Sequence, residues 1–200
     1  MDTSQLAFDD RPSLRAALVF TVFVLLGCGL LYELAGTALG RVLFPHQAQG
    51  TLIERDGRVV GSTLVAQPFA DARYFQPRPS AAGYDPMAVA GSNQARSNPA
   101  LRQSMAERRS IVAQREGLPE SAVPGDLLTA SGSGIDPDLS PAAAAVQVAR
   151  VAKARGMSVD AVQALLRANT TPPQFGLLGE PRVNVLELNL ALDAAATRPE

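Results

Sequence analysis

The segment Thr129–Asp136, TASGSGID, contains the residues of this chain that are best suited to bind an anion. Backbone N–H groups in a loop of alternating serine and glycine can bind phosphate. The candidate nucleotide-binding residues are Ser131, Gly132, Ser133 and Gly134. However, the next helix is expected to start only at Ser140, and the carboxylates of Asp136 and Asp138 intervene and would repel a nucleotide. Chemistry alone therefore favours a glycine-dependent turn, with nucleotide binding as the alternative.

The residue types that catalysis and metal binding need are scarce. His46 is the only histidine, Cys28 the only cysteine and Lys153 the only lysine. No phosphate-binding loop with its lysine, zinc motif or Ser-His-Asp triad can be assembled around them. We therefore predict that this chain alone is not an enzyme and has no catalytic residue, no metal site and no cofactor of its own.

The overall charge argues against a nucleic-acid-binding protein. The 18 Lys and Arg residues are dispersed and are opposed by 19 Asp and Glu, which gives a net charge of −1. A nucleic-acid-binding protein would instead show a basic patch or stripe. With 46% hydrophobic residues in 200, the chain can form one domain with a core, plus an appendage.

A long apolar segment near the N-terminus predicts a membrane anchor. Residues 16–31 carry no charge, and the extension to Gly40 adds only Glu33. At about 1.5 Å per residue, such a helix exceeds the ~30 Å apolar thickness of a bilayer. It is also longer than the apolar region of a cleavable signal peptide, so we favour an uncleaved transmembrane helix at 14–40 after a short tail at 1–13. Glu33 would contact a partner helix or reach the membrane interface.

The rest of the chain predicts one small soluble α+β domain over residues 42–195, followed by a frayed tail at 196–200. The pair Asp56-Gly57 between β-rich runs indicates a hairpin with a type I′ turn. Near the C-terminus, leucines alternate as in a strand, but Asn184 and Glu187 form a capping-box pattern that favours a helix.

Three further helices have clear start and stop signals. Asn98 or Ser97 with Pro99 should begin the first, and Gly117 should end it. Ser140 should begin a second, continuous helix that ends at Gly156. A third, short helix should follow Ser158.

Between the hairpin and the first helix lies a proline-rich stretch with aromatic residues. Exposed aromatic residues and arginines are favoured anchors of protein interfaces. Together with Glu33 in the anchor, the candidate partner contacts are Tyr74, Phe75, Arg78 and Tyr84. The alternative for the aromatic residues is that they fill the core of the domain.

Several long motifs carry a resemblance to a known family. FPHQAQGTLI, TASGSGIDP, QVARVAKARG and GEPRVNVLELNLALD occur in this order along the chain. The chain resembles, over roughly residues 12–193, the C subunit of the Kdp-type potassium-transporting ATPases.

The resemblance implies an inner-membrane complex that hydrolyses ATP to import potassium. The implied partners are a channel-like subunit, a phosphorylated P-type ATPase subunit that uses the ATP, and a small single-span subunit. The C subunit is expected to stabilise the assembly and to act as a catalytic chaperone that raises the ATP affinity of the ATPase subunit.

The family's topology places the N-terminus in the cytoplasm and the domain in the periplasm, whereas the charges flanking the span give no orientation. ATP is cytoplasmic, so a periplasmic domain could affect its binding only indirectly. In that case residues 131–134 serve as a turn. Valine at Gly132 or Gly134 should then reduce the yield of the complex, because valine resists positive φ.

Overall fold

A computed structural model describes residues 14–196, which form two compact units that meet between Gly50 and Thr51. The predicted N-terminal tail, and the C-terminal tail beyond Ala196, lie outside the described residues. Each unit is described by itself, because their relative placement is not determined.

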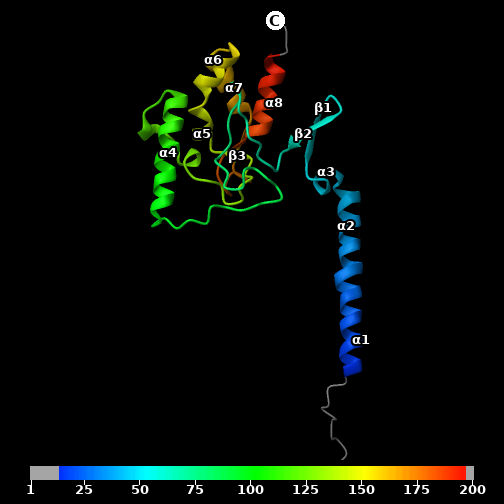
Figure 1. Cartoon of the computed structure of the whole chain (residues 1–200). Coiled ribbons are helices and arrows are strands. Elements are labelled where there is room, and N and C mark those ends of the chain that lie inside the picture. Colours follow the sequence, from blue (N-terminus) through cyan, green and yellow to red (C-terminus); the bar gives the residue numbers. More distant parts are fainter. Residues whose placement is uncertain (1–13, 197–200) are drawn as a thin grey trace, which may run out of the picture. The chain divides into compact units, whose positions relative to one another are not determined.

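The first unit is one long helix followed by a short one. Helix α1 (Leu14–Val24), a π-helical stretch (Leu25–Leu31) and α2 (Tyr32–Leu43) run without a break (Figure 1). Together they form 30 residues that are long and apolar enough to cross a membrane. Phe44 leaves the helical conformation, and Pro45 begins the single turn α3 (Pro45–Ala48).

The second unit opens with the predicted hairpin. Strands β1 (Leu52–Arg55) and β2 (Arg58–Ser62) pair antiparallel. Asp56 and Gly57 have φ values of +52° and +73°, as a type I′ turn requires. The hairpin prediction is confirmed.

Two of the three predicted internal helices have the expected bounds. In α4 (Pro99–Glu116) the side chain of Asn98 accepts a hydrogen bond from the backbone N–H of Ala100, and Gly117 ends the helix at φ +68°. In α7 (Val159–Ala168) the side chain of Ser158 accepts from the backbone N–H of Ala161. Both starts follow from side chains that bond otherwise unsatisfied N–H groups.

The second predicted helix is divided, which corrects the expectation of a continuous one. Ser140 caps α5 (Pro141–Ala145), and Gly156 ends α6 (Val148–Arg155). Between them the backbone tightens, and the N–H of Gln147 donates to the carbonyl of Ala144. The side chain of Gln147 bonds the backbone of Gln76, and these bonds hold Gln147 in the turn between the two helices.

A small sheet and the last helix complete the domain. Strands β3 (Asp138–Leu139), β5 (Arg182–Asn184) and β4 (Thr170–Thr171) lie antiparallel in that order, and Val183 is paired with Leu139 and with Thr170. Helix α8 (Val185–Ala196) follows directly. The Asn184 side chain accepts from the N–H of Glu187, so the prediction of a helix here is confirmed.

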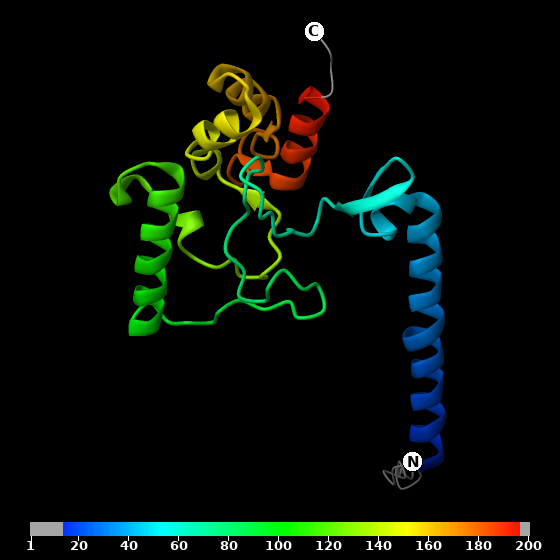
Figure 2. The same cartoon turned by 45° about the horizontal axis from the view of Figure 1, so that its top comes forward.

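The core lies among these helices. Helix α4 lies on one side of the domain and α8 on the other, with α5 and α6 between them (Figures 1 and 2). Short 3-10 turns at Glu120–Ala122 and Gly125–Leu127 follow α4. The largest fully buried apolar side chains are Phe75, Val151, Val162, Val183, Leu188 and Leu192.

Candidate functional site

The segment Ala72–Gln76, which we call the clamped segment, is held by side chains instead of a neighbouring strand. The Asn189 carboxamide accepts from the N–H of Phe75 at 2.8 Å and donates to the Phe75 carbonyl at 3.0 Å. Gln147 does the same for Gln76, at 2.9 and 3.1 Å. Both amide side chains are fully buried, so these four bonds satisfy polar groups that water cannot reach.

Two arginines of α6 bind the remaining carbonyls of the clamped segment. Arg150 donates to the carbonyls of Ala72 and Tyr74 at 2.6 and 3.0 Å. Arg155 donates to the carbonyl of Arg73 at 2.7 Å. Five consecutive carbonyls therefore accept hydrogen bonds from side chains of α5–α6 and α8.

A buried carboxylate joins the clamp to α4. Glu116, in the last turn of α4, lies 2.6 Å from Arg115 and 2.9 Å from Arg150, and its side chain has no exposed surface. Arg115 also donates to the side chain of Gln76. A buried ion pair is tolerated only when its remaining hydrogen-bonding capacity is satisfied, and this condition is met here.

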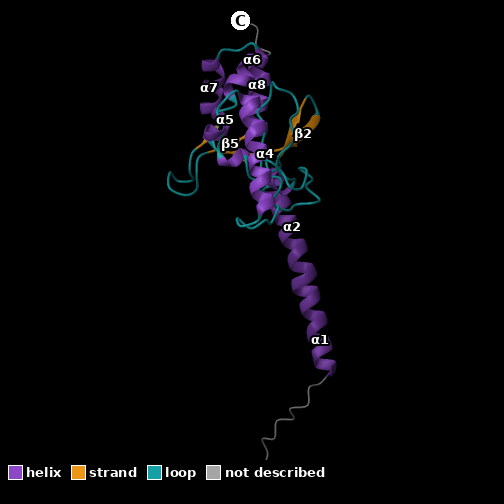
Figure 3. Cartoon of the chain, turned by 60° about the vertical axis from the view of Figure 1, so that its left-hand side comes forward, coloured by secondary structure: helices purple, strands orange, loops and turns teal. Residues whose placement is uncertain are grey.

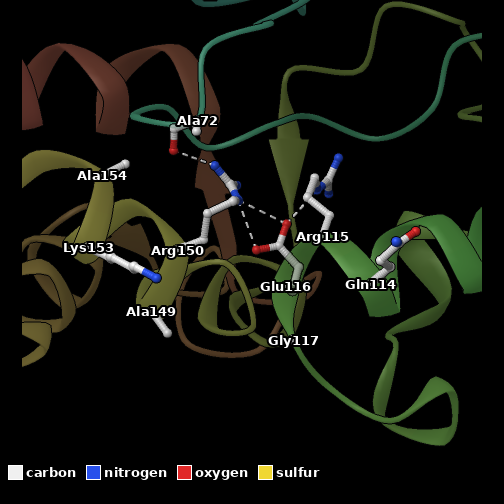
Figure 4. Close-up of a pocket in the computed structure, with 9 residues that line it drawn as sticks. All are labelled: Ala72, Gln114, Arg115, Glu116, Gly117, Ala149, Arg150, Lys153 and Ala154. Carbon is white, nitrogen blue, oxygen red and sulfur yellow. Dashed lines mark hydrogen bonds and ion pairs between the residues drawn. The ribbon is translucent and has the colours of Figure 1, made fainter.

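An open cleft of about 560 Å³ surrounds this charge cluster, between the C-terminal end of α4 and one face of α6 (Figure 4). Arg150 points from its wall toward Glu116 and the carbonyl of Ala72. The lining also includes Lys153. Over residues 14–196, no group of three or more His, Cys, Asp or Glu is placed to hold a metal ion. Arg150 and Glu116 connect α4, α6 and the clamped segment.

The candidate nucleotide-binding residues 131–134 lie in the segment Ser131–Ile135, which we call the glycine loop, and three of its five N–H groups donate within the domain. Ser131 donates to the carbonyl of Pro79 at 3.0 Å, and its buried hydroxyl accepts from the N–H of Gly134 at 2.8 Å. The Ser133 hydroxyl accepts from the N–H of Ile135 at 3.2 Å. These three donors are therefore already paired in the absence of an anion.

Only one of the two central glycines needs positive φ. Gly134 has φ +77°, and a Cβ there would lie 2.6 Å from the carbonyl oxygen of Ala90 and 2.7 Å from the Cβ of Ala82. Gly132 is not in the left-handed region, and a Cβ there would meet nothing within 4 Å. The expected requirement for positive φ is confirmed at Gly134 and is wrong at Gly132.

The acids after the glycine loop are paired with arginines. Asp136 lies 3.1 Å from Arg78, and Asp138 lies 3.2 Å from Arg182. Burial raises the pKa of Asp138 above its ordinary value, and the charge of Arg182 opposes this rise. The negative charge that would repel a nucleotide is thus partly neutralised within the domain.

The predicted partner contacts lie in different environments. Phe75 is 1% exposed and belongs to the core, whereas Tyr74 is half-buried, donates to Asp193 and lies 4.9 Å from the Arg155 guanidinium. The Tyr84 hydroxyl donates to the Arg78 carbonyl, and burial raises the pKa of Tyr84. The structure thus brings Arg78 and Tyr84 together. The fifth residue, Glu33, is exposed on α2 in the other unit.

An exposed apolar turn was not singled out from the sequence. The connection between β4 and β5 projects from the domain beside β5 (Figure 3). Its residues Pro173–Gly179, which we call the apolar turn, expose Phe175, Leu177 and Leu178 by 87%, 83% and 57%. The signal was present in PPQFGLLG, where large apolar residues occupy a stretch bounded by prolines and glycines that predicts a loop.

Comparisons with known proteins agree on one family. The family model for KdpC, described as the K+-transporting ATPase c chain, matches residues 14–194. A potassium-transporting ATPase KdpC subunit of Xanthomonas campestris pv. campestris (strain B100) is 62% identical, over 98% of this chain and 93% of the relative.

More distant relatives carry the same description. The KdpC subunit of Gemmatimonas aurantiaca is 53% identical over 93% of this chain and 95% of its own length. That of Methylococcus capsulatus is 50% identical over 92% and 96%. Matches of this extent include the anchor helix, the clamp, the glycine loop and the apolar turn. The chain belongs to the KdpC family, the c chain of the K+-transporting ATPases.

Proposed function

We propose that this KdpC chain is a non-catalytic subunit that stabilises its potassium-transporting ATPase and raises the ATP affinity of the P-type ATPase subunit from a distance. The observation that carries the proposal is that three N–H groups of the glycine loop, two of them on the four candidate residues, are paired inside the domain. Its N–H groups at Ser131, Gly134 and Ile135 bond protein acceptors, and none of these three needs a phosphate. The loop therefore suits a structural turn better than a nucleotide cradle.

The long helix fits the role of a membrane anchor that packs against a partner. Leu14–Leu43 has the length and composition of a span. In α2, Gly36 and Gly40 are four residues apart, a spacing that allows close approach of two helices in lipid. Glu33 lies one turn before Gly36 and adds a polar group that favours a protein neighbour over lipid.

An indirect effect on ATP requires coupling through the complex. We infer that the N-terminus is cytoplasmic and the domain periplasmic, with contacts to the channel-like, P-type and small single-span subunits of the assembly. A subunit shifts the affinity of a distant site only if it binds two states of the complex differently. The clamped segment is joined to α4 through the Glu116 ion pairs, and a domain connected in this way can favour one state.

Cysteine labelling tests the sidedness. Cys28 is the only cysteine, so Cys28→Ser with Met87→Cys gives a single thiol at a position that is 92% exposed. A membrane-impermeant maleimide should label this thiol in intact spheroplasts. Thr3→Cys combined with Cys28→Ser alone gives a single thiol on the expected cytoplasmic side. This control should react with the maleimide only after lysis. The reverse pattern would overturn the periplasmic placement.

Comparison of complexes tests the effect on ATP. The ATPase purified with the full chain should show a lower KM for ATP than the same complex prepared without it, and a better recovery after detergent dilution. A photoreactive ATP analogue should label the P-type subunit alone. Labelling of residues 131–134 would instead establish direct nucleotide contact by the glycine loop.

A further inference from the structure

We propose that the apolar turn is a docking knob that inserts into an apolar pocket on another subunit of the potassium-transporting ATPase. The inference rests on the proposed function, since it requires the assembled complex. Phe175, Leu177 and Leu178 are its contact residues. Aromatic residues, Phe among them, are enriched at the buried centres of protein interfaces.

The turn is pre-organised for docking. The N–H of Gln174 donates to the carbonyl of Leu178 at 2.8 Å, and the N–H of Leu178 donates back to the carbonyl of Gln174 at 2.9 Å. Pro172 and Pro173 restrict the chain just before it. A turn that is already fixed loses little conformational entropy on binding, so more of its apolar contact appears as affinity.

The backbone of the turn is strained without a visible benefit to the domain. Phe175 has φ +57°, which is rare for a bulky residue. Gly176 at φ +73° and Gly179 at φ +83° complete the turn. This conformation aims Phe175 outward, where its side chain is 87% exposed and adds nothing to the core. Strain of this kind is characteristic of binding sites.

The charge around the knob favours a protein pocket over a lipid surface. Residues 168–179 carry no charge, and the next charged residue on the C-terminal side is Glu180. Binding to anionic bacterial lipid relies on clustered Lys and Arg, which this stretch lacks. The nearest charges, Arg167 before the stretch and Glu180 and Arg182 after it, are of mixed sign, so an uncharged knob with such flanks fits an apolar pocket with a polar rim.

A second copy of the chain is a poor occupant. The knob is convex, and its three contact residues bury far less than the roughly 1,200–2,000 Å² of a stable interface. Docking of one knob therefore needs an assembly that other contacts already hold together. The membrane anchor supplies such a contact in the proposed complex.

Photo-crosslinking in the intact complex tests the occupant. p-Benzoyl-phenylalanine replaces Phe175 in the full chain, and the same residue replaces Met87 as a control of similar exposure. The Phe175 probe should crosslink one specific partner subunit several times more efficiently than the Met87 probe. A crosslink to lipid, to a second copy of this chain, or to nothing would overturn the inference.

A triple variant measures the contribution of the knob. Phe175→Ser with Leu177→Ser and Leu178→Ser should reduce recovery of the complex after detergent dilution about tenfold or more, as expected for loss of a hot spot. Met87→Ser with Val89→Ser removes other exposed apolar side chains and should leave recovery unchanged. If the triple variant assembles normally and still lowers the KM for ATP, the knob is refuted and the proposed function stands. If the unaltered chain fails to associate with the ATPase, the proposed function itself fails.

Discussion

The glycine loop and the apolar turn both depend on glycine and have opposite surroundings. Each has a glycine at positive φ, Gly134 at +77° and Gly176 at +73°. The glycine loop donates to Pro79 and buries Ser131, whereas the apolar turn bonds mainly to itself and exposes Phe175. A glycine-rich turn is therefore not a binding site by its composition. Its role depends on which of its polar groups and side chains stay unpaired or exposed in the folded domain.

The largest loss of stability is expected at the clamped segment. This segment lies just before Pro79, whose carbonyl accepts the hydrogen bond from the glycine loop. Asn189→Leu removes both bonds to Phe75 and leaves its N–H and carbonyl buried without partners. Each such group costs about 1–3 kcal/mol, so the free energy of unfolding should fall by about 2–6 kcal/mol. Chemical denaturation of the full chain in detergent would measure it.

The matched control for this variant lies on the same helix. Glu187 is exposed on α8, and Glu187→Gln should change the free energy of unfolding by less than about 0.5 kcal/mol. Equal losses in the two variants would mean that helix α8, and not the clamp, is what the substitution disturbs.

The next largest effect separates the two glycines of the glycine loop. Gly134→Val should lower stability by about 1–3 kcal/mol, because valine resists φ +77° and its Cβ would collide with Ala90. Gly132→Val should have little effect, since space is open there. Thermal unfolding of the two variants side by side measures the difference, and equal melting temperatures would contradict the inward-facing description of this loop.

The apolar turn should give the opposite result. The triple serine variant at Phe175, Leu177 and Leu178 should keep the stability of the isolated chain within about 0.5 kcal/mol, because these side chains are largely exposed. The same denaturation measurement checks this expectation. A large loss of stability would show that the turn supports the domain and would remove the contrast between the two regions.

The smallest effect is a pH dependence of stability that arises at Asp138, just after the glycine loop. Burial raises the pKa of Asp138 above 3.8, so the folded state holds this proton more tightly than the unfolded state does. The resulting stabilisation is present below the ordinary pKa and is lost as the pH rises through the raised value. Asp138→Asn should therefore raise the melting temperature slightly near pH 7, and the gain should vanish below about pH 4.

The ion pair limits this gain without reversing it. Arg182 loses a partner in the Asn variant, but its side chain is 53% exposed, and pairs of this kind contribute little. Residues 168–179 contain no titratable side chain, so the apolar turn should show no matching pH dependence. If the melting temperature of the unaltered chain rose as the pH increased from about 4 to 7, and that of the Asn variant did not, the assigned sign would be wrong.

Local signals explain how much of the fold the sequence predicts. Asn98, Ser140 and Ser158 cap helices because each places an oxygen near free N–H groups, and Gly117 and Gly156 end helices because they accept positive φ. These effects involve neighbours in sequence, so they can be inferred without a structure.

The clamp could not be predicted because it joins distant residues. Gln147 bonds Gln76, and this contact both divides the second predicted helix and fixes the clamped segment. Nothing near Gln147 in the sequence distinguishes it from an ordinary polar residue of a helix. The same limit applies to the backbone of Phe75, which is bonded by Asn189, 114 residues further along the chain.

The separation of Phe75 and Asn189 in the sequence has a consequence for folding during synthesis on the ribosome. The anchor helix ends at Leu43, whereas the last part of the clamp arrives with α8 at Val185–Ala196. At about 5–20 residues per second, synthesis needs roughly 7 to 30 s to bridge this distance. Throughout this interval the segment around Phe75 has no Asn189 to bind. The nascent domain therefore stays open until translation is nearly complete, and a transcript cut before codon 185 should yield an anchored chain that proteases remove.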